Sequence, residues 1–207
     1  MPLVMPISEN KSTIAGVVLA GGRARRMDNQ DKGLIHFKSR PLIYYAIEAL
    51  SAVCQQTFIN ANRNFVDYDA FGLAVITDQT DSFDGPLAGI LATLLHTDAD
   101  LLLVMPCDTP YFKAEHLLRL LTARAEHDAD IAVAFDGIQL HPLFLALKTS
   151  LTENLQDYLA SGQRKVGDWL KPLNSVYVDF SHELDIFINI NTSDELAALE
   201  TRDDKQA

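Results

Sequence analysis

The feature that most constrains the fold is a short apolar run that ends in a glycine-rich loop. Residues Ile14–Leu19 are mostly apolar and partly β-branched, which predicts a buried strand. Two adjacent glycines, Gly21 and Gly22, follow this strand. Adjacent glycines let the backbone turn sharply and bring its N–H groups close to a ligand. A helical pattern begins at Pro41, so the sequence predicts a strand whose carboxyl end opens into a ligand-binding loop.

The same loop concentrates positive charge. Arg23, Arg25, Arg26 and Lys32 lie within ten residues of the glycines, in a chain whose net charge is −11. Backbone N–H groups beside dense positive charge suit phosphate oxygens. The loop is not a Walker A motif, because no Gly-Lys-Ser/Thr follows, and it is not the dinucleotide fingerprint, because its glycines are adjacent. It is therefore predicted to be another type of phosphate-binding loop.

Length and composition narrow the class of protein. A chain of 207 residues with 48% hydrophobic and 22% charged residues predicts one soluble globular domain. We expect this domain over residues 13–200, between a tail at residues 1–12 and a tail at residues 201–207. The N-terminus lacks the basic region of a signal peptide, and no apolar run is long enough to cross a bilayer. With only two cysteines, a cytoplasmic protein with reduced thiols is favoured, and the acidic balance argues against nucleic-acid binding.

Apolar periodicity predicts alternating strands and helices along the chain. The predicted strands are Ile14–Ala20, Thr57–Asn60, Leu73–Thr77, Leu101–Met105, Asp130–Phe135, Leu143–Leu147, Ser175–Phe180 and Phe187–Ile190. The predicted helices are Pro41–Val53, Leu87–His96, Ala114–Glu126, Leu151–Ala160, Val166–Leu170 and Thr192–Glu200, where Thr192 and Glu195 form a capping box. This alternation is typical of a three-layer α/β protein with a mostly parallel sheet. Ligands of such sheets bind at the carboxyl ends of the strands.

Polar residues follow several predicted strands at that edge. Asp108 comes shortly after the apolar run Leu101–Met105. A carboxylate there suits Mg²⁺, which takes oxygen ligands and substrate phosphates, but an aspartate before Thr-Pro is also an ordinary turn residue. Asn60 and Asp78 follow two other predicted strands. Their side chains can hydrogen-bond to a purine base, or they can serve only as turn residues.

Three further pairs of residues are candidates for contacts with a second substrate. Asn189 and Asn191 alternate along a predicted strand and would point to one face, where they could hold a ligand or cap the end of the sheet. Arg164 and Lys165 are weaker candidates for phosphate contacts, and His141 precedes Pro142 as a weak candidate for a ring contact.

Taken together, the motifs resemble a known family. The chain reads L-A-G-G-x-x-x-R-M-x-x-x-D-K over residues 19–32, N-A-N-R over 60–63, G-P-L-A-G over 85–89, P-C-D-T-P over 106–110 and N-I-N-T over 189–192. The first motif resembles the signature loop of nucleotidyltransferases that have a Rossmann-like sheet of the nucleotide-diphospho-sugar transferase type. The combination is most similar to the bacterial molybdenum cofactor guanylyltransferases, the MobA family. This resemblance covers nearly the whole chain after the first dozen residues.

The resemblance implies a reaction and a set of site residues. The family's reaction is the Mg²⁺-dependent transfer of GMP from GTP to the terminal phosphate of a molybdopterin-type cofactor, with release of pyrophosphate. Catalytic roles fall on Lys32, Arg26 and Asp108, and Asp108 is the metal ligand. Nucleotide-binding positions fall on Leu19, Ala20, Gly21, Gly22, Lys32, Asn60, Asp78 and Asp108. Other proteins of molybdenum cofactor synthesis, and recipient molybdoenzymes or their chaperones, are the partners implied.

One departure and two alternatives accompany this interpretation. Members of the family usually have glycine after the Arg-Met pair, where this chain has Asp28, so the loop tip is expected to be shaped differently. The chain could instead be a cytidylyl- or sugar-phosphate nucleotidylyltransferase of the same superfamily. It could also be a guanine-nucleotide-binding protein without catalysis, although the presence of Lys32 and Asp108 at the family's catalytic positions argues against this. The attacking phosphate of the family's reaction is already ionised, which fits the lack of a Ser-His-Asp or Cys-His constellation.

Overall fold

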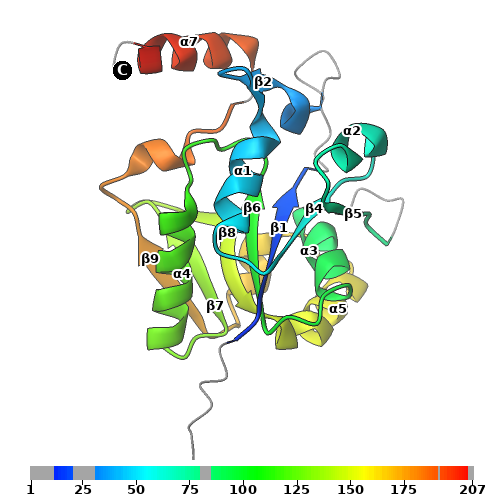
Figure 1. Ribbon diagram of the computed structural model, residues 1–207. Coiled ribbons are helices and arrows are strands. Elements are labelled where there is room, and N and C mark those ends of the chain that lie inside the picture. The colour runs from blue at the N-terminus through cyan, green and yellow to red at the C-terminus, as the bar shows by residue number, and fades with distance from the viewer. Residues whose placement is uncertain (1–11, 21–30, 80–84, 191, 205–207) are drawn as a thin grey trace, which may run out of the picture.

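A single large sheet organises the chain. The computed structural model describes residues 12–20, 31–79, 85–190 and 192–204 (Figure 1). Across these residues a seven-stranded sheet has the order β5-β4-β1-β6-β8-β7-β9. Its strands are β1 (Ile14–Leu19), β4 (Gln56–Asn60), β5 (Ala74–Ile76), β6 (Leu101–Pro106), β7 (Ile131–Phe135), β8 (Leu140–Lys148) and β9 (Ser175–Asp179).

One half of the sheet is entirely parallel. Strand β1 lies between β4 and β6 and is parallel to both, and β4 is also parallel to β5. All six residues of β6 are buried, as expected for a parallel strand covered on both faces. The carboxyl ends of these strands therefore meet at one edge of the sheet, the upper edge in Figure 1.

The other half contains one reversed strand. Strand β8 is antiparallel to both β6 and β7, whereas β7 and β9 are parallel. A tight turn joins β7 to β8, in which Asp136 accepts hydrogen bonds from the backbone N–H groups of Ile138 and Gln139. So short a connection allows only antiparallel pairing. As a result, β8 begins at the edge where its neighbours end. The prediction of a mostly parallel sheet is confirmed, and this reversal was not predicted.

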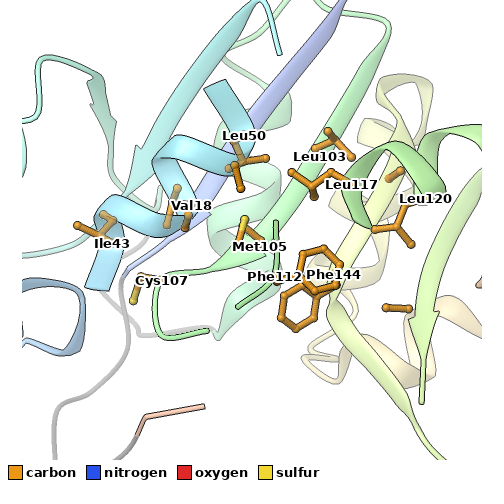
Figure 2. Close-up of a cluster of buried hydrophobic side chains, with 14 of the residues drawn as sticks. Val18, Ile43, Leu50, Leu103, Met105, Cys107, Phe112, Leu117, Leu120 and Phe144 are labelled. Atoms are coloured by element: carbon orange, nitrogen blue, oxygen red, sulfur yellow. The ribbon is translucent and has the colours of Figure 1, made fainter. Parts of the chain in front are cut away.

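Helices cover both faces of the sheet, which confirms the three layers. Helices α1 (Leu42–Ser51) and α4 (Ala114–Glu126) pack on one face, and Figure 2 shows their apolar residues meeting the sheet through Val18, Leu103 and Met105. Helices α3 (Pro86–Leu94), α5 (Thr152–Ala160) and α6 (Val166–Leu170) pack on the other face. The neighbours Val17 and Val18 enter opposite clusters, since successive strand side chains point to opposite faces.

Several short elements lie around this core. They are the 3₁₀ helices η1 (Lys32–Leu34), η2 (Thr149–Leu151) and η3 (Leu184–Phe187), the antiparallel pair β2 (His36–Phe37) and β3 (Arg40–Pro41), and helix α2 (Phe65–Asp69). Helix α7 (Ser193–Asp204) closes the described chain and extends past the predicted end at Glu200. Its cap is confirmed in part, because the backbone N–H of Glu195 donates to the Thr192 hydroxyl at 3.1 Å.

The predicted strand Phe187–Ile190 is wrong. Its first residue ends η3, and the residues that follow pair with none of the described strands. The backbone N–H of Ile190 instead donates to the carbonyl of Asp108. A short apolar run does not distinguish a strand from another buried segment. Among the described residues, no helix combines the length and the apolar character that crossing a bilayer requires.

Candidate functional site

A cavity of about 750 Å³ opens at the carboxyl edge of the sheet. The end of β1, the residues after β4, β5 and β6, and the start of β8 contribute to its walls. The sequence-predicted site residues that line it are Leu19, Ala20, Lys32, Asn60, Asp78, Asp108, His141 and Asn189. The chain thus brings together, in one cavity, side chains that are far apart in the sequence. This is the edge where ligands bind to parallel sheets.

Lys32 and Asp108 form the charged centre of the cavity. The Lys32 Nζ lies 3.2 Å from the Asp108 Oδ2, although these residues are 76 positions apart in the sequence. Lys32 begins η1, and Asp108 follows the buried end of β6. An ammonium beside a carboxylate at a strand end is a natural place for phosphate oxygens and their counter-ion.

Asp108 has an atom that fits a metal ion. Its Oδ1 is buried and accepts no hydrogen bond from any residue that the structure describes. A buried carboxylate oxygen without a donor is costly unless a ligand or cation satisfies it. The described residues contain no group of three or more His, Cys, Asp or Glu side chains that could hold a metal ion by themselves. This donor set fits Mg²⁺, which protein sites often hold through one or two carboxylates plus substrate phosphates.

Asp78 stands at the centre of a second polar cluster. Its Oδ1 accepts from the Asn60 amide at 3.0 Å, and its Oδ2 accepts from the Asn62 amide at 2.8 Å. The Asn60 amide also donates to the carbonyl of Ile76, and Asn62 accepts from the backbone N–H of Asp78. The two asparagines therefore fix the Asp78 carboxylate at the ends of β4 and β5. We call Lys32, Asn60, Asn62, Asp78 and Asp108 the polar half of the cavity.

Gly89 makes room for Asn60. A Cβ built on Gly89 would lie 2.1 Å from the Asn60 Oδ1, which no real contact allows. Gly89 belongs to the G-P-L-A-G motif of residues 85–89. The structure places Gly85 and Pro86 in the cavity wall, but Gly89 packs against a side chain of the protein. The sequence carries no signal for this contact, because it joins two separate motifs.

The opposite end of the cavity is aromatic. The His141 ring stacks on Phe187 with a centroid separation of 3.7 Å and an interplanar angle of 4°. The His141 Nε2 lies 2.7 Å from the Asp136 Oδ2. The pKa of Asp136 is lowered to about 2 by the hydrogen bonds from the Gln139 backbone and from His141. We call His141, Phe144, Phe187 and Asn189 the aromatic half of the cavity.

Cys107 lines the cavity but is unsuited to nucleophilic chemistry. It is buried, and burial raises the pKa of its thiol well above the ordinary value. Burial likewise raises the pKa of Cys54 to about 12. The chain's two cysteines are both free thiols, as the sequence predicted. A thiolate is the reactive form of cysteine, so neither residue is primed to react.

The remaining predicted site residues fall into two groups. Gly21, Gly22, Arg26 and Asn191, like Asp28, lie outside the described residues. Arg164 and Lys165 are not part of the cavity wall, and the Arg164 guanidinium donates to the carbonyls of Leu159 and Gln163. Phe187 is the main residue that sequence reasoning missed, because it was assigned to a strand.

Fold and site together define a class of protein. A largely parallel α/β sheet with a lysine, carboxylates and amides at its carboxyl edge is the arrangement of a nucleotide-binding enzyme of the Rossmann-like type. Residues 16–176 match the model of the MobA-like NTP transferase domain. The chain belongs to this family of nucleotidyltransferases.

Individual relatives agree with the family assignment. The chain is 42% identical over 183 residues to the molybdenum cofactor guanylyltransferase of Shewanella piezotolerans. The aligned region covers 88% of this chain and 90% of the relative. It is 40% identical over 189 residues to the protein of the same name from Shewanella frigidimarina, covering 91% and 96%.

A solved structure supports the same assignment. The molybdopterin-guanine dinucleotide biosynthesis protein A of Archaeoglobus fulgidus superimposes with a TM-score of 0.76 at 27% identity, covering 92% of this chain and 99% of that protein. A nucleotidyl transferase from Methanothermobacter, 21% identical with a TM-score of 0.73, shares the fold and covers 94% and 99% of the two chains.

Proposed function

We propose that this protein transfers GMP from GTP to the terminal phosphate of a molybdopterin-type cofactor. The products are molybdopterin guanine dinucleotide and pyrophosphate. The observation that carries the proposal is the division of one cavity into a polar half and an aromatic half, with Lys32 and Asp108 in its wall. We call the polar half the nucleotide half and the aromatic half the acceptor half, after the substrates proposed for them. The two Shewanella relatives are named molybdenum cofactor guanylyltransferases, which supports the same reaction.

Asp78 is the proposed reader of the base. Guanine presents its N1–H and exocyclic amine as adjacent donors, and a carboxylate can accept from both. Each oxygen of Asp78 accepts one amide hydrogen bond and retains a further lone pair. Asn60 would act through Asp78, because its own amide hydrogens are already donated to the protein. Adenine and cytosine lack this donor pair, so the remaining lone pairs of the Asp78 carboxylate would receive no hydrogen bond from them.

Lys32 and Asp108 are the proposed phosphate-binding and catalytic groups. An oxygen of the acceptor phosphate attacks the α-phosphorus of GTP, and the bond from that phosphorus to the bridging oxygen of the β-phosphate breaks. The attacking phosphate is already ionised, so no general base is required. Lys32 would bind the phosphate oxygens and offset the charge that develops on them. Asp108 would hold Mg²⁺, which when bound supplies further positive charge at the phosphates. Arg26 is proposed to assist from the glycine loop.

The acceptor half is proposed to bind the pterin. A planar heterocycle can stack on the His141 ring, whose other face is covered by Phe187. Asp136 holds the ring in orientation through the His141 Nε2. Asn189, in the same wall, offers an amide to the polar edge of the acceptor. Because GTP is an intracellular nucleotide, we place the reaction in the cytoplasm, where the product would pass to recipient molybdoenzymes or their chaperones.

The reaction can be tested directly with purified protein. Incubation with molybdopterin, Mg²⁺ and GTP labelled at the α-phosphate should move the label into a guanine dinucleotide and release one pyrophosphate for each product. Lys171→Ala is a suitable control variant for the Lys32 variant, because Lys171 pairs with Asp168 at an exposed position away from the cavity. Failure of the wild-type protein to form the dinucleotide, with both substrates shown to bind, would contradict the proposal.

A further inference from the structure

Asp31, the residue before the catalytic lysine, is enclosed by donors. It is only 5% exposed. Its Oδ1 accepts from the Tyr68 hydroxyl at 2.6 Å and from the backbone N–H of Gly33 at 3.3 Å. Its Oδ2 accepts from the Asn64 amide at 3.0 Å and from the Arg63 Nε at 3.3 Å. We call Arg63, Asn64 and Tyr68 the Asp31 clamp.

The clamp belongs to a different part of the chain from Asp31. Arg63 and Asn64 follow β4, and Tyr68 is a fully buried residue of α2. Asn64 precedes α2 with φ at 53°, a left-handed conformation that is uncommon for residues other than glycine. Its side chain does not cap the helix and donates to Asp31 instead. Asparagine adopts this conformation more readily than most other residues that carry a side chain.

Tyr68 is a fixed donor in this arrangement. Burial raises the pKa of its hydroxyl, and the nearby Cys107 and Asp31 add to the effect. In a hydrogen bond between a neutral tyrosine and a carboxylate, the hydroxyl is the donor and the carboxylate oxygen is the acceptor. The hydroxyl also lies 2.8 Å from the position that a Cβ on Gly33 would occupy, so the start of η1 packs closely against it. Asp31 and η1 are therefore held in one place relative to α2.

We propose that the Asp31 clamp is a positioning device for the catalytic lysine. Asp31 is the N-cap residue of η1, and Lys32 is the first residue of that helix. Fixing the Asp31 carboxylate fixes the backbone from which Lys32 reaches the Oδ2 of Asp108 at 3.2 Å. With four donors on its two oxygens, Asp31 is committed to this role and is not the metal ligand.

The clamp also links the two ends of the nucleotide half. Asn60 and Asn62, which hold Asp78, lie in the same stretch of chain as Arg63 and Asn64. The side chains proposed for the base and the lysine proposed for the phosphates therefore share one support. This inference rests on the proposed function, because it assigns Tyr68, Asn64 and Arg63 a role in the same reaction.

The most conservative test removes one oxygen atom. Tyr68→Phe keeps the buried ring but deletes the hydrogen bond to Asp31. Because small displacements of a catalytic group are costly, we expect kcat to fall roughly 10–100-fold, while KM for GTP changes by less than about twofold. Tyr45→Phe is the matched control, since the Tyr45 hydroxyl donates to the Phe37 carbonyl at 2.8 Å outside the cavity. This control should retain wild-type kcat.

A second pair of variants separates positioning from general damage. If Tyr68 acts through Lys32, Tyr68→Phe should cause no further loss in a Lys32→Ala background, because residues that act as a unit are not additive. Equal kcat for Tyr68→Phe and Tyr45→Phe would overturn the inference. An undiminished loss in the Lys32→Ala background would overturn it as well.

One readout is independent of catalysis, and so it separates failure of this inference from failure of the proposed function. Acetylation of Lys32 by an N-hydroxysuccinimide ester can be followed by peptide mass spectrometry without any substrate. Release of Asp31 should loosen the pairing of Lys32 with Asp108 and speed acetylation of Lys32 in Tyr68→Phe, with no change in Tyr45→Phe. The same rate in both variants would contradict the clamp even in a protein that proved to have another reaction.

Discussion

The nucleotide half and the acceptor half of the cavity are built by different means. In the nucleotide half, polar side chains follow parallel strands and hold one another by hydrogen bonds of 2.8–3.2 Å, as Asn62 and Asp78 do. In the acceptor half, the reversed strand β8 and the helix η3 supply rings that are held by stacking, as His141 and Phe187 are.

This difference teaches how each half can act. Fixed charges and amides cost no reorganisation when charge develops on a phosphate, so the nucleotide half is suited to lowering the barrier. An aromatic surface contributes burial and stacking, which favour binding more than chemistry. Substitutions in the first half should therefore reduce turnover, and substitutions in the second should raise KM for the acceptor.

The largest effect is expected from Lys32→Ala. Loss of one preorganised positive group should lower kcat by roughly 10²–10³, without unfolding, because the side chain lies in the cavity wall. The measurement is steady-state dinucleotide formation with the Lys171→Ala control. A near-wild-type rate for Lys32→Ala would remove the lysine from the catalytic site and weaken the contrast between the halves.

Asp108→Asn should separate the metal from the fold. The amide keeps the shape but loses the charge that a hard cation requires, so Mg²⁺-dependent product formation should fall by at least roughly tenfold. Raised Mg²⁺ should restore part of the rate, and circular dichroism should be unchanged. Asp168→Asn is the control, since Asp168 forms an exposed pair with Lys171. An unchanged rate and Mg²⁺ dependence would make Asp108 only a turn residue.

Gly89→Ala should disturb the base site without touching the ligand. The added methyl group would displace Asn60, and Asp78 would lose one of its two amide donors. A lost hydrogen bond to a charged group is worth about 1.5–3 kcal/mol, so affinity for GTP should fall roughly tenfold or more by calorimetry. Gly167→Ala is the matched control, because a Cβ there meets no atom within 4 Å. Equal affinities in the two variants would show that Asn60 does not support the base site.

The smallest effect is expected in the acceptor half. Phe187→Leu removes the ring that supports His141, and an aromatic pair is worth about 0.5–1.5 kcal/mol, so KM for molybdopterin should rise a few-fold. Affinity for GTP should not change. Tyr177→Leu, at an exposed position of β9, is the control. A loss of kcat in place of a rise in KM would show that the acceptor half contributes to the chemical step and not only to binding of the acceptor.

The sequence predicted the nucleotide half far better than the acceptor half. The family resemblance named Lys32, Asn60, Asp78 and Asp108. Asn60, Asp78 and Asp108 end or closely follow strands, and Lys32 comes later in the connection after β1, so their meeting at one edge fits the parallel orientation of those strands. The alternation of strands and helices was sufficient to predict that most of the strands are parallel. The same alternation predicted the three layers, and the presence of only two cysteines predicted the free thiols.

Contacts between distant side chains could not be predicted in this way. The reversal of β8 depends on the tight turn at Asp136, and Phe187 lies in a short apolar run that gave a wrong strand. The bond from Tyr68 to Asp31 spans 37 residues and joins a helix that was not predicted. Hydrophobic periodicity describes which face of an element is buried, but it carries no information about such partners.

Choice of base tests the central claim most directly, because the claim is that the nucleotide half is built for guanine. Equal concentrations of GTP, ATP, CTP and UTP are mixed with limiting molybdopterin and Mg²⁺, and the dinucleotides are quantified by mass spectrometry. A hydrogen bond from the base to the charged Asp78 is worth about 1.5–3 kcal/mol, so the guanine product should exceed every other by at least roughly tenfold. Asp78→Asn should reduce that excess. Comparable amounts of the cytosine and guanine dinucleotides from the wild-type protein would contradict the account.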